Sequence, residues 1–374
     1  MRRRGWMSLV AIALGVVLAG ATILVIIRPV SQGQREPGES SSAAESATSA
    51  SPTAASTPSE VDIPSDDDAG DHAQDHTEGQ AAVLGAYERT RDAVLSVLDA
   101  QGQAEALAEL DRLIAADPSV SGICHAVAHD LGHAALDGVG GDAAKALSDR
   151  DDVCGGGYTH GVIEKALGES PNVKRDLLRI CAPRQDGSCF HGVGHGLMFA
   201  TDMDPQKSLH LCDLSPDSLL AHRCAEGVFM QLFSGDIAAA HAAGSGLPTL
   251  EAARAECEAT RETYQANCWF YSPNVWLAAH PDDFLGAMDW CRGATTELGR
   301  ASCIRGTGSR AVKYHPDDLT IAEGVCAKAG SNRPDCVGGM ASYWSVHWKG
   351  EVPRSDLCDR LGKKRLAAIC RQVT

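Results

Sequence analysis

Hydrophobic and polar positions along the chain first separate an apolar N-terminal run from the rest. Residues 7–27 contain no charged side chain, and Arg2, Arg3 and Arg4 precede them. About 20 apolar residues suffice for a helix to cross a bilayer, and basic flanks stay on the cytoplasmic side. The small residues that could form a signal-peptide cleavage site lie inside this run, not after it. We therefore predict a cytoplasmic tip and an uncleaved transmembrane signal anchor over residues 1–30, which leaves the body extracytoplasmic.

The next segment, residues 31–80, is dominated by Ser, Ala, Thr, Pro, Glu and Asp and contains no aromatic residue. Such a segment buries too little apolar area to offset the entropy lost on ordering. We predict a disordered acidic stalk here. Beyond the stalk, apolar residues between 81 and 115 recur at helical spacing, which predicts a helical cap over residues 81–123.

Cysteines mark a repeat over residues 124–374. The class that opens each unit recurs every 33 to 35 residues, apart from one interval of 44, at Cys154, Cys189, Cys224, Cys268, Cys303, Cys336 and Cys370. A second class lies late in each unit, at Cys181, Cys212, Cys257, Cys291, Cys326 and Cys358. This period is typical of stacked two-helix hairpins. We predict an all-α fold, a disulfide-stapled α-solenoid of about seven helical-hairpin repeats.

Prolines and carboxylates predict where the second helix of a hairpin begins. Pro205 follows Asp204, and both Pro281 and Pro316 are followed by two aspartates. Proline at the first helical position with acidic residues in the first turn is a signature of a helix start. Three hairpins are therefore expected to begin their second helix at these prolines.

Two disulfide schemes fit the cysteine spacing. In the first, each late cysteine pairs with the next opening cysteine across a short loop, as Cys181–Cys189, Cys212–Cys224, Cys257–Cys268, Cys291–Cys303, Cys326–Cys336 and Cys358–Cys370, which leaves Cys124–Cys154. Both ends of such a loop lie at the same edge of a helical stack, so the bond is within reach. In the second scheme, pairs form within hairpins, for instance Cys189 with Cys212. We favour the short loops, and either scheme indicates an oxidising compartment.

The segments LLRICAPRQDGSCFHGVGHGLM and LHLCDLSPDSLLAHRCAEGVFMQ carry a junction in which one cysteine closes a helix and another opens the next. This junction resembles that of the Sel-one-like repeats, relatives of the tetratricopeptide repeats, especially their secreted cysteine-rich members. The resemblance covers period and cysteine placement over residues 150–374. It implies an α-solenoid with a binding role, and it implies no catalytic residues.

Histidines gather in the first three units. His129 and His133 form one box, His191 and His195 form another, and His125 lies four residues before His129. Residues four apart share one face of a helix, so each box can present two imidazoles to one ion. Aligned on the cysteines, the remaining candidate ligands fall at related positions of other units: His160, Glu164 and Glu226.

These residues predict a transition-metal site of zinc, iron or copper, since imidazole and carboxylate suit all three. Successive helices stack at about 8–10 Å, which would place the first and third units roughly 20 Å apart. One site would then use His129, His133 and His160, and the other Glu164, His191 and His195. Packing histidines or a pH-sensing cluster are the alternatives.

Charge and composition narrow the function further. The net charge of −16 excludes a basic nucleic-acid-binding face as the main role. The expected partners are the membrane, through the N-terminal helix, and an extracytoplasmic protein. The leading hypothesis is a binding or scaffold protein with a metal site. The alternatives are a metal-dependent hydrolase or oxygenase, with Glu164 or Asp130 as general base, and a purely structural protein-binding solenoid.

Overall fold

The computed structural model describes residues 69–117, 119–148, 153–182, 186–233, 246–347 and 353–374. Across these segments every regular element is a helix and none is a strand. No helix among them is both long and apolar enough to cross a membrane. The predicted anchor over residues 1–30 lies outside the described segments, as does the stalk up to residue 68.

The first two helices precede the cysteines. They are α1 (Ala69–Gln101) and α2 (Gln103–Ala116), joined at Gly102, whose φ of 97° suits glycine. Helix α1 begins at Ala69, eleven residues before the predicted end of the stalk at residue 80, so it extends back beyond the apolar spacing from which it was predicted.

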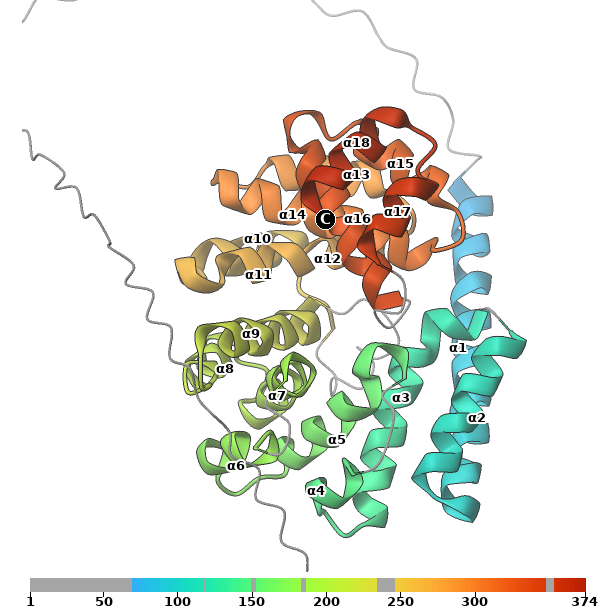
Figure 1. Cartoon of the computed structure of the whole chain (residues 1–374), viewed down its shortest axis with the longest axis vertical. Helices are drawn as coiled ribbons and strands as arrows, with labels where there is room; N and C mark the ends of the chain where they lie inside the picture. The colour runs from blue at the N-terminus through green and yellow to red at the C-terminus, as the bar shows by residue number, and fades with distance from the viewer. Residues whose placement is uncertain (1–68, 118, 149–152, 183–185, 234–245, 348–352) are drawn as a thin grey trace, which may run out of the picture. The chain divides into compact units, whose positions relative to one another are not determined.

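The helices that follow form two series (Figure 1). The first series holds the opening helix of each unit: α3 (Ser119–Gly138), α5 (Gly157–Gly168), α7 (Gly187–Ala200), α9 (Ser218–Phe233), α11 (Glu262–Tyr271), α14 (Glu297–Tyr314), α16 (Arg333–His347) and α18 (Lys364–Val373). The second series holds the return helices: α4 (Ala143–Ala146), α6 (Val173–Ile180), α8 (Pro205–Cys212), α10 (Leu250–Ala259), α13 (Phe284–Arg292), α15 (Leu319–Ala327) and α17 (Arg354–Arg360). Three short elements complete the set: η1 (Cys154–Gly156), α12 (Pro273–Ala279) and η3 (Gly330–Asn332).

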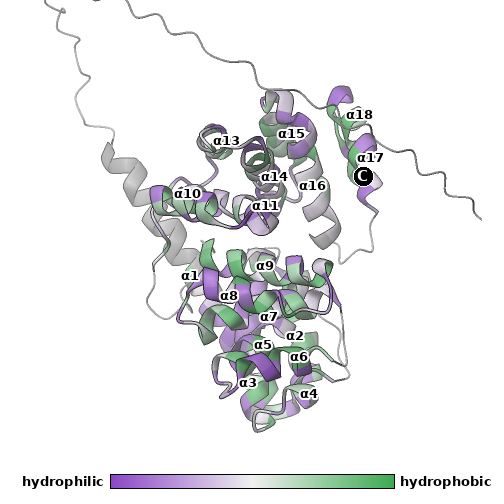
Figure 2. Ribbon diagram, turned by 90° about the vertical axis from the view of Figure 1, so that its left-hand side faces the viewer, coloured by the Kyte–Doolittle hydropathy of each residue, from purple (hydrophilic) through white to green (hydrophobic). Residues whose placement is uncertain are grey.

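Each opening helix packs against the opening helix of the next unit, from α3 through α5, α7, α9, α11, α14 and α16 to α18. Most of the return helices pack against the opening helices next to them. Both views show this order for α3, α5, α7 and α9, and Figure 2 shows apolar and polar residues alternating along these helices. An opening helix is therefore covered on several sides, and α5 is buried at every position from Gly157 to Glu164.

Aspartates cap four of the seven return helices. Asp204 precedes Pro205 and accepts a hydrogen bond from the Lys207 amide, so α8 begins at its proline as predicted. The prediction was wrong at Pro281 and Pro316: α13 and α15 begin three residues later, after the capping residues Asp283 and Asp318. After Pro281 the backbone turns at Asp282, with a φ of 61°, before the helix begins.

All fourteen cysteines are paired, and the pairs are those of the short-loop scheme. The seven disulfides are Cys124–Cys154, Cys181–Cys189, Cys212–Cys224, Cys257–Cys268, Cys291–Cys303, Cys326–Cys336 and Cys358–Cys370. Six of them join the end of a return helix to the next opening helix, while Cys124–Cys154 joins α3 to η1. The sulfurs lie among apolar side chains of the core, most of them fully buried.

Glycine sets how closely the opening helices approach. A Cβ on Gly161, Gly227, Gly306 or Gly339 would fall within 3.0 Å of a carbonyl oxygen on the preceding opening helix. The last three lie at the same position, the third residue after the opening cysteine. Real Cβ atoms essentially never come this close to backbone, so these helices cross where no side chain intervenes.

The disulfide pattern predicts the products of a non-reducing digest. We expect a peptide that links Cys212 to Cys224 and no free thiol, because each bond closes a short loop at one edge of the fold. Mass spectrometry of the digest measures both. A peptide linking Cys189 to Cys212 would contradict the structure.

The glycine crossings predict that a Gly→Ala substitution lowers the stability of the fold at a crossing and raises it elsewhere on a helix. Gly306→Ala and Gly339→Ala each introduce a methyl group against backbone, which lowers the free energy of unfolding by about 1–3 kcal/mol. Gly324→Ala in α15 is the control, since no atom of the described residues lies within 4 Å of a Cβ placed there, and alanine raises stability by up to about 1 kcal/mol. Urea denaturation under non-reducing conditions measures all three. Crossing variants as stable as the wild type would refute a steric role for these glycines.

Candidate metal centre

Three consecutive opening helices supply a cluster of imidazoles. Helix α3 carries His125, His129 and His133 at four-residue spacing, so all three lie on one face. Helix α5 adds His160, and α7 adds His191 and His195. The close crossing of α3 and α5 at Gly161 draws the three rows of side chains together.

The imidazole rings converge across all three helices. The ring of His160 lies 4.8–5.6 Å from those of four others: His125, His129, His191 and His195. The rings of His129 and His195, from the first and third units, are 5.3 Å apart. The expected separation of roughly 20 Å was therefore wrong for the side chains. Glycine crossings bring the helices together, and the imidazoles of α3 and α7 reach past α5 toward each other.

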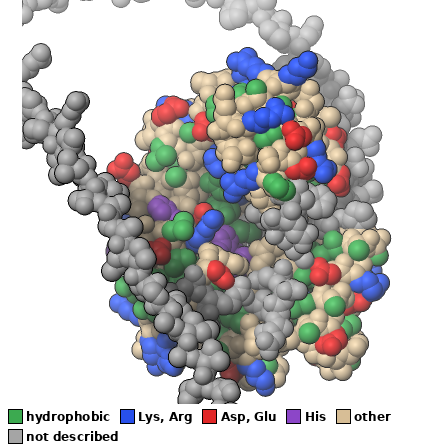
Figure 3. Space-filling view, in the orientation of Figure 1, with side chains coloured by type: hydrophobic (Ala, Val, Ile, Leu, Met, Phe, Trp, Pro, Cys, Tyr) green, Lys and Arg blue, Asp and Glu red, His purple; other side chains and the backbone are tan. Residues whose placement is uncertain are grey.

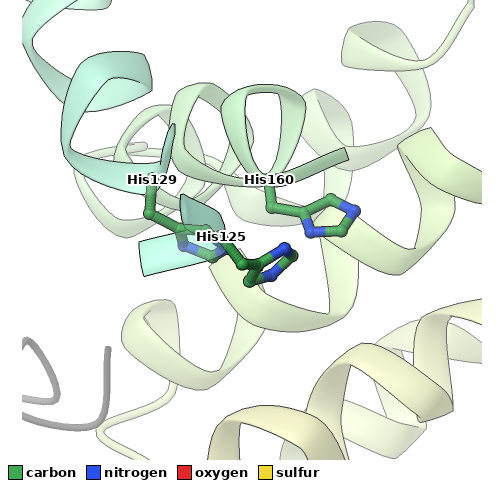
Figure 4. Close-up of side chains that lie close together, drawn as sticks. All are labelled: His125, His129 and His160. Atoms are coloured by element: carbon green, nitrogen blue, oxygen red, sulfur yellow. The ribbon is translucent and has the colours of Figure 1, made fainter. Parts of the chain in front are cut away.

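Two groups of three histidines could each hold a metal ion. His125, His129 and His160 form the first group (Figure 4), and His160, His191 and His195 form the second. Within each group the candidate ligand atoms lie within 4.8 Å of one another. His160 belongs to both.

Protein oxygens fix the orientation of three of these rings. The Nδ1 atoms of His125, His129 and His195 lie 2.6–2.9 Å from the Cys154 carbonyl, a Glu164 carboxylate oxygen and the Gln231 amide oxygen. These oxygens only accept, so each Nδ1 carries the proton and donates it. In the neutral ring the lone pair is then on Nε2, the nitrogen that can bind a metal. Metal-binding histidines commonly have such an acceptor behind them.

The Nε2 atoms of these three rings are the nitrogens left for a metal ion. Those of His125 and His129 face each other at 3.1 Å, a distance at which two lone pairs need a proton or a metal ion beside them. The Nε2 of His195 and the Nδ1 of His160 are buried and have no hydrogen-bond partner among the residues that the structure describes. Buried polar atoms are normally satisfied, so these nitrogens indicate a missing ligand.

Burial keeps the centre of the cluster neutral. It lowers the pKa of His160 and His195 well below the ordinary histidine value, and neighbouring imidazoles lower both further. Burial alone would raise the pKa of Glu164, but the charge and hydrogen bonds of His129 and His133 outweigh it and hold the pKa below its usual range. The centre thus combines the neutral imidazoles of His160 and His195 with one ionised carboxylate, that of Glu164.

The other predicted ligands lie beside the two groups. His133 donates through Nε2 to the same Glu164 oxygen that binds His129, at 2.9 Å. Glu226 pairs with Arg223 at 2.8 Å and lies 3.9 Å from Nδ1 of His191. Asp130 accepts a hydrogen bond from the Tyr87 hydroxyl of α1. The two groups of candidate ligands therefore differ from the predicted ones: neither contains His133 or Glu164. Glu164 instead accepts hydrogen bonds from His129 and His133.

Two residues of α9 at the cluster did not emerge from the sequence. Gln231 accepts from His195, and the sulfur of Met230 lies 3.4 Å from Nε2 of His191. Met230 is the sixth residue after its opening cysteine, as are His160 and His195 after theirs, so alignment of the units could have revealed it.

The geometry suits a small transition-metal ion. Two nitrogens on one tetrahedral zinc lie about 3.3 Å apart, since each zinc–nitrogen bond is about 2.0–2.1 Å. The 3.1 Å between the Nε2 atoms of His125 and His129 is close to this value. Figure 3 shows histidine side chains in a recessed part of one face, beside hydrophobic and charged groups. His133 and His191 retain partial exposure, so an ion could enter from solvent.

Comparison with protein-family models, with curated proteins and with solved structures found no match. The functional interpretation therefore rests on the chain's own geometry.

Proposed function

We propose that this protein binds a transition metal through the histidine cluster of α3, α5 and α7, and that it does so as a membrane-anchored extracytoplasmic α-solenoid. The observation that carries the metal proposal is the convergence of five imidazoles with buried, unpartnered nitrogens among them. Packing histidines would satisfy these nitrogens with protein acceptors, because an unsatisfied buried polar atom destabilises the fold by about 1–3 kcal/mol.

The ligand set favours copper or zinc over iron. Each group offers imidazole nitrogens alone, which suit copper and zinc. Non-haem iron sites typically add one carboxylate to two histidines. The nearest carboxylate, Glu164, already accepts hydrogen bonds from His129 and His133, so it orients ligands instead of joining them.

The proposed location rests on the apolar N-terminal segment and on the disulfides of the body. The apolar run over 7–27 would anchor the protein, and the arginines before it would hold the N-terminus in the cytoplasm. Seven disulfides suit the oxidising side of a membrane. The row of opening helices, each packed on the next, supports a solenoid that binds an extracytoplasmic protein partner.

Binding is better supported than hydrolysis or oxygenation. The enzyme hypothesis assigns the general base to a carboxylate, which would have to take up a proton near the metal. Asp130 is engaged by Tyr87, and two histidines hold Glu164 ionised. Both candidate bases of the enzyme hypothesis therefore have other roles.

Metal uptake tests the proposal. We expect the full chain, purified in mild detergent and stripped with a chelator, to retain at least about one equivalent of zinc or copper(II) after reconstitution and desalting. His129→Ala and His195→Ala should each reduce retention, whereas His210→Ala, which changes an exposed histidine outside the cluster, should not. Elemental analysis gives the stoichiometry. Retention of less than about a tenth of an equivalent by the wild type would refute a metal site.

The carboxylate behind His129 gives a second prediction. Glu164→Gln keeps the size of the side chain but places an amide where two imidazole N–H groups now meet one carboxylate. We expect the affinity for zinc to fall about 10–100-fold, the usual effect of losing such a partner. Competition with a fluorescent zinc chelator measures it, with Glu169→Gln, which changes an exposed carboxylate outside the cluster, as the control. An unchanged affinity would show that Glu164 does not support a metal ligand.

A further inference from the structure

His160 occupies the centre of the cluster and is the only residue shared by its two groups. Its ring is nearly parallel to that of His195, 5.3 Å away, and stands edge-on to that of His129 at 5.6 Å. Helix α5, which carries it, is packed between α3 and α7. His160 therefore lies beside two imidazoles of each neighbouring opening helix, α3 and α7.

The two nitrogens of His160 have different surroundings. In Figure 4 one ring nitrogen points toward His125 and the other points away from it. The residue is 3% exposed, and in the described part of the chain its Nδ1 has no hydrogen-bond partner. The rings of His125, His129 and His195, by contrast, each have an acceptor at Nδ1 that leaves only Nε2 for a metal. His160 is thus the ring in which no protein acceptor blocks Nδ1.

Each group also has its own carboxylate. Glu164 bonds His129 of the first group at 2.9 Å, and Glu226 lies 3.9 Å from His191 of the second. A divalent ion in a buried site needs nearby negative charge. Two such carboxylates on separate helices, α5 and α9, match two ions better than one.

We propose that the cluster binds two transition-metal ions and that His160 bridges them through both ring nitrogens. The first ion is bound by His125, His129 and one nitrogen of His160, and the second by His191, His195 and the other nitrogen. To use both nitrogens, His160 gives up its N–H proton to solvent as the second ion binds, and the ring becomes an imidazolate. This inference rests on the proposed function and extends it to a dinuclear site.

Copper(II) alone, added to the stripped full chain in detergent, is the probe. We expect about two equivalents to be retained, and an electron paramagnetic resonance signal much weaker than two isolated copper(II) ions give, because the bridge couples their spins. Two equivalents with the full signal of isolated ions would overturn the bridge. One equivalent would overturn the dinuclear site while leaving metal binding intact, and none would overturn both.

Single-site variants separate the two ions. His125→Ala and His191→Ala each remove a ligand of one group, and each should retain about one equivalent with an uncoupled signal. Both residues are less buried than His160, so their loss should leave the helical circular dichroism unchanged. His210→Ala is the control and should behave as the wild type. Retention of both coupled ions in either variant would contradict the assignment of ligands.

Discussion

The close crossing of the opening helices is the constraint on which the rest of this structure depends. At Gly161, Gly227, Gly306 and Gly339 the backbone of one helix contacts a carbonyl of the helix before it, with no room for a side chain. Glycine weakens each helix by about 1 kcal/mol relative to alanine, so the stability must come from packing and covalent links. Seven disulfides supply such links, six of them where one hairpin passes to the next. Loops of this size contribute about 2–4 kcal/mol each by restricting the unfolded chain.

The same constraint creates the histidine cluster. Helices that cross at glycine bring side chains of three successive units within ring contact, which ordinary helix spacing would prevent. Helix α5 is then enclosed, so His160 and Glu164 are buried although both are polar. Enclosure makes unpartnered nitrogens unfavourable, and a bound metal would satisfy them. The close crossing of the helices therefore accounts both for the burial of α5 and for the proximity of the candidate metal ligands.

Much of the fold could be predicted from the sequence, because cysteine spacing and apolar periodicity are local signals. The helical hairpins and the short-loop disulfide pairs follow from them. The ligand groups could not be predicted, since they depend on interhelical distance and rotamers. An average helix spacing gave too large a distance between His129 and His195. The glycines beside the histidines in the sequence could have indicated a closer approach of the helices. The predicted helix starts at Pro281 and Pro316 were wrong because a turn lies between each proline and the first residue of the helix.

The most direct test of the account is a crystal structure of the zinc-loaded protein with diffraction data recorded at the zinc absorption edge. The account predicts anomalous density between α3, α5 and α7, within about 2.0–2.1 Å of imidazole nitrogens and on both sides of the His160 ring. Anomalous density only at other surfaces, or none at all with the five histidines ordered as described, would contradict it.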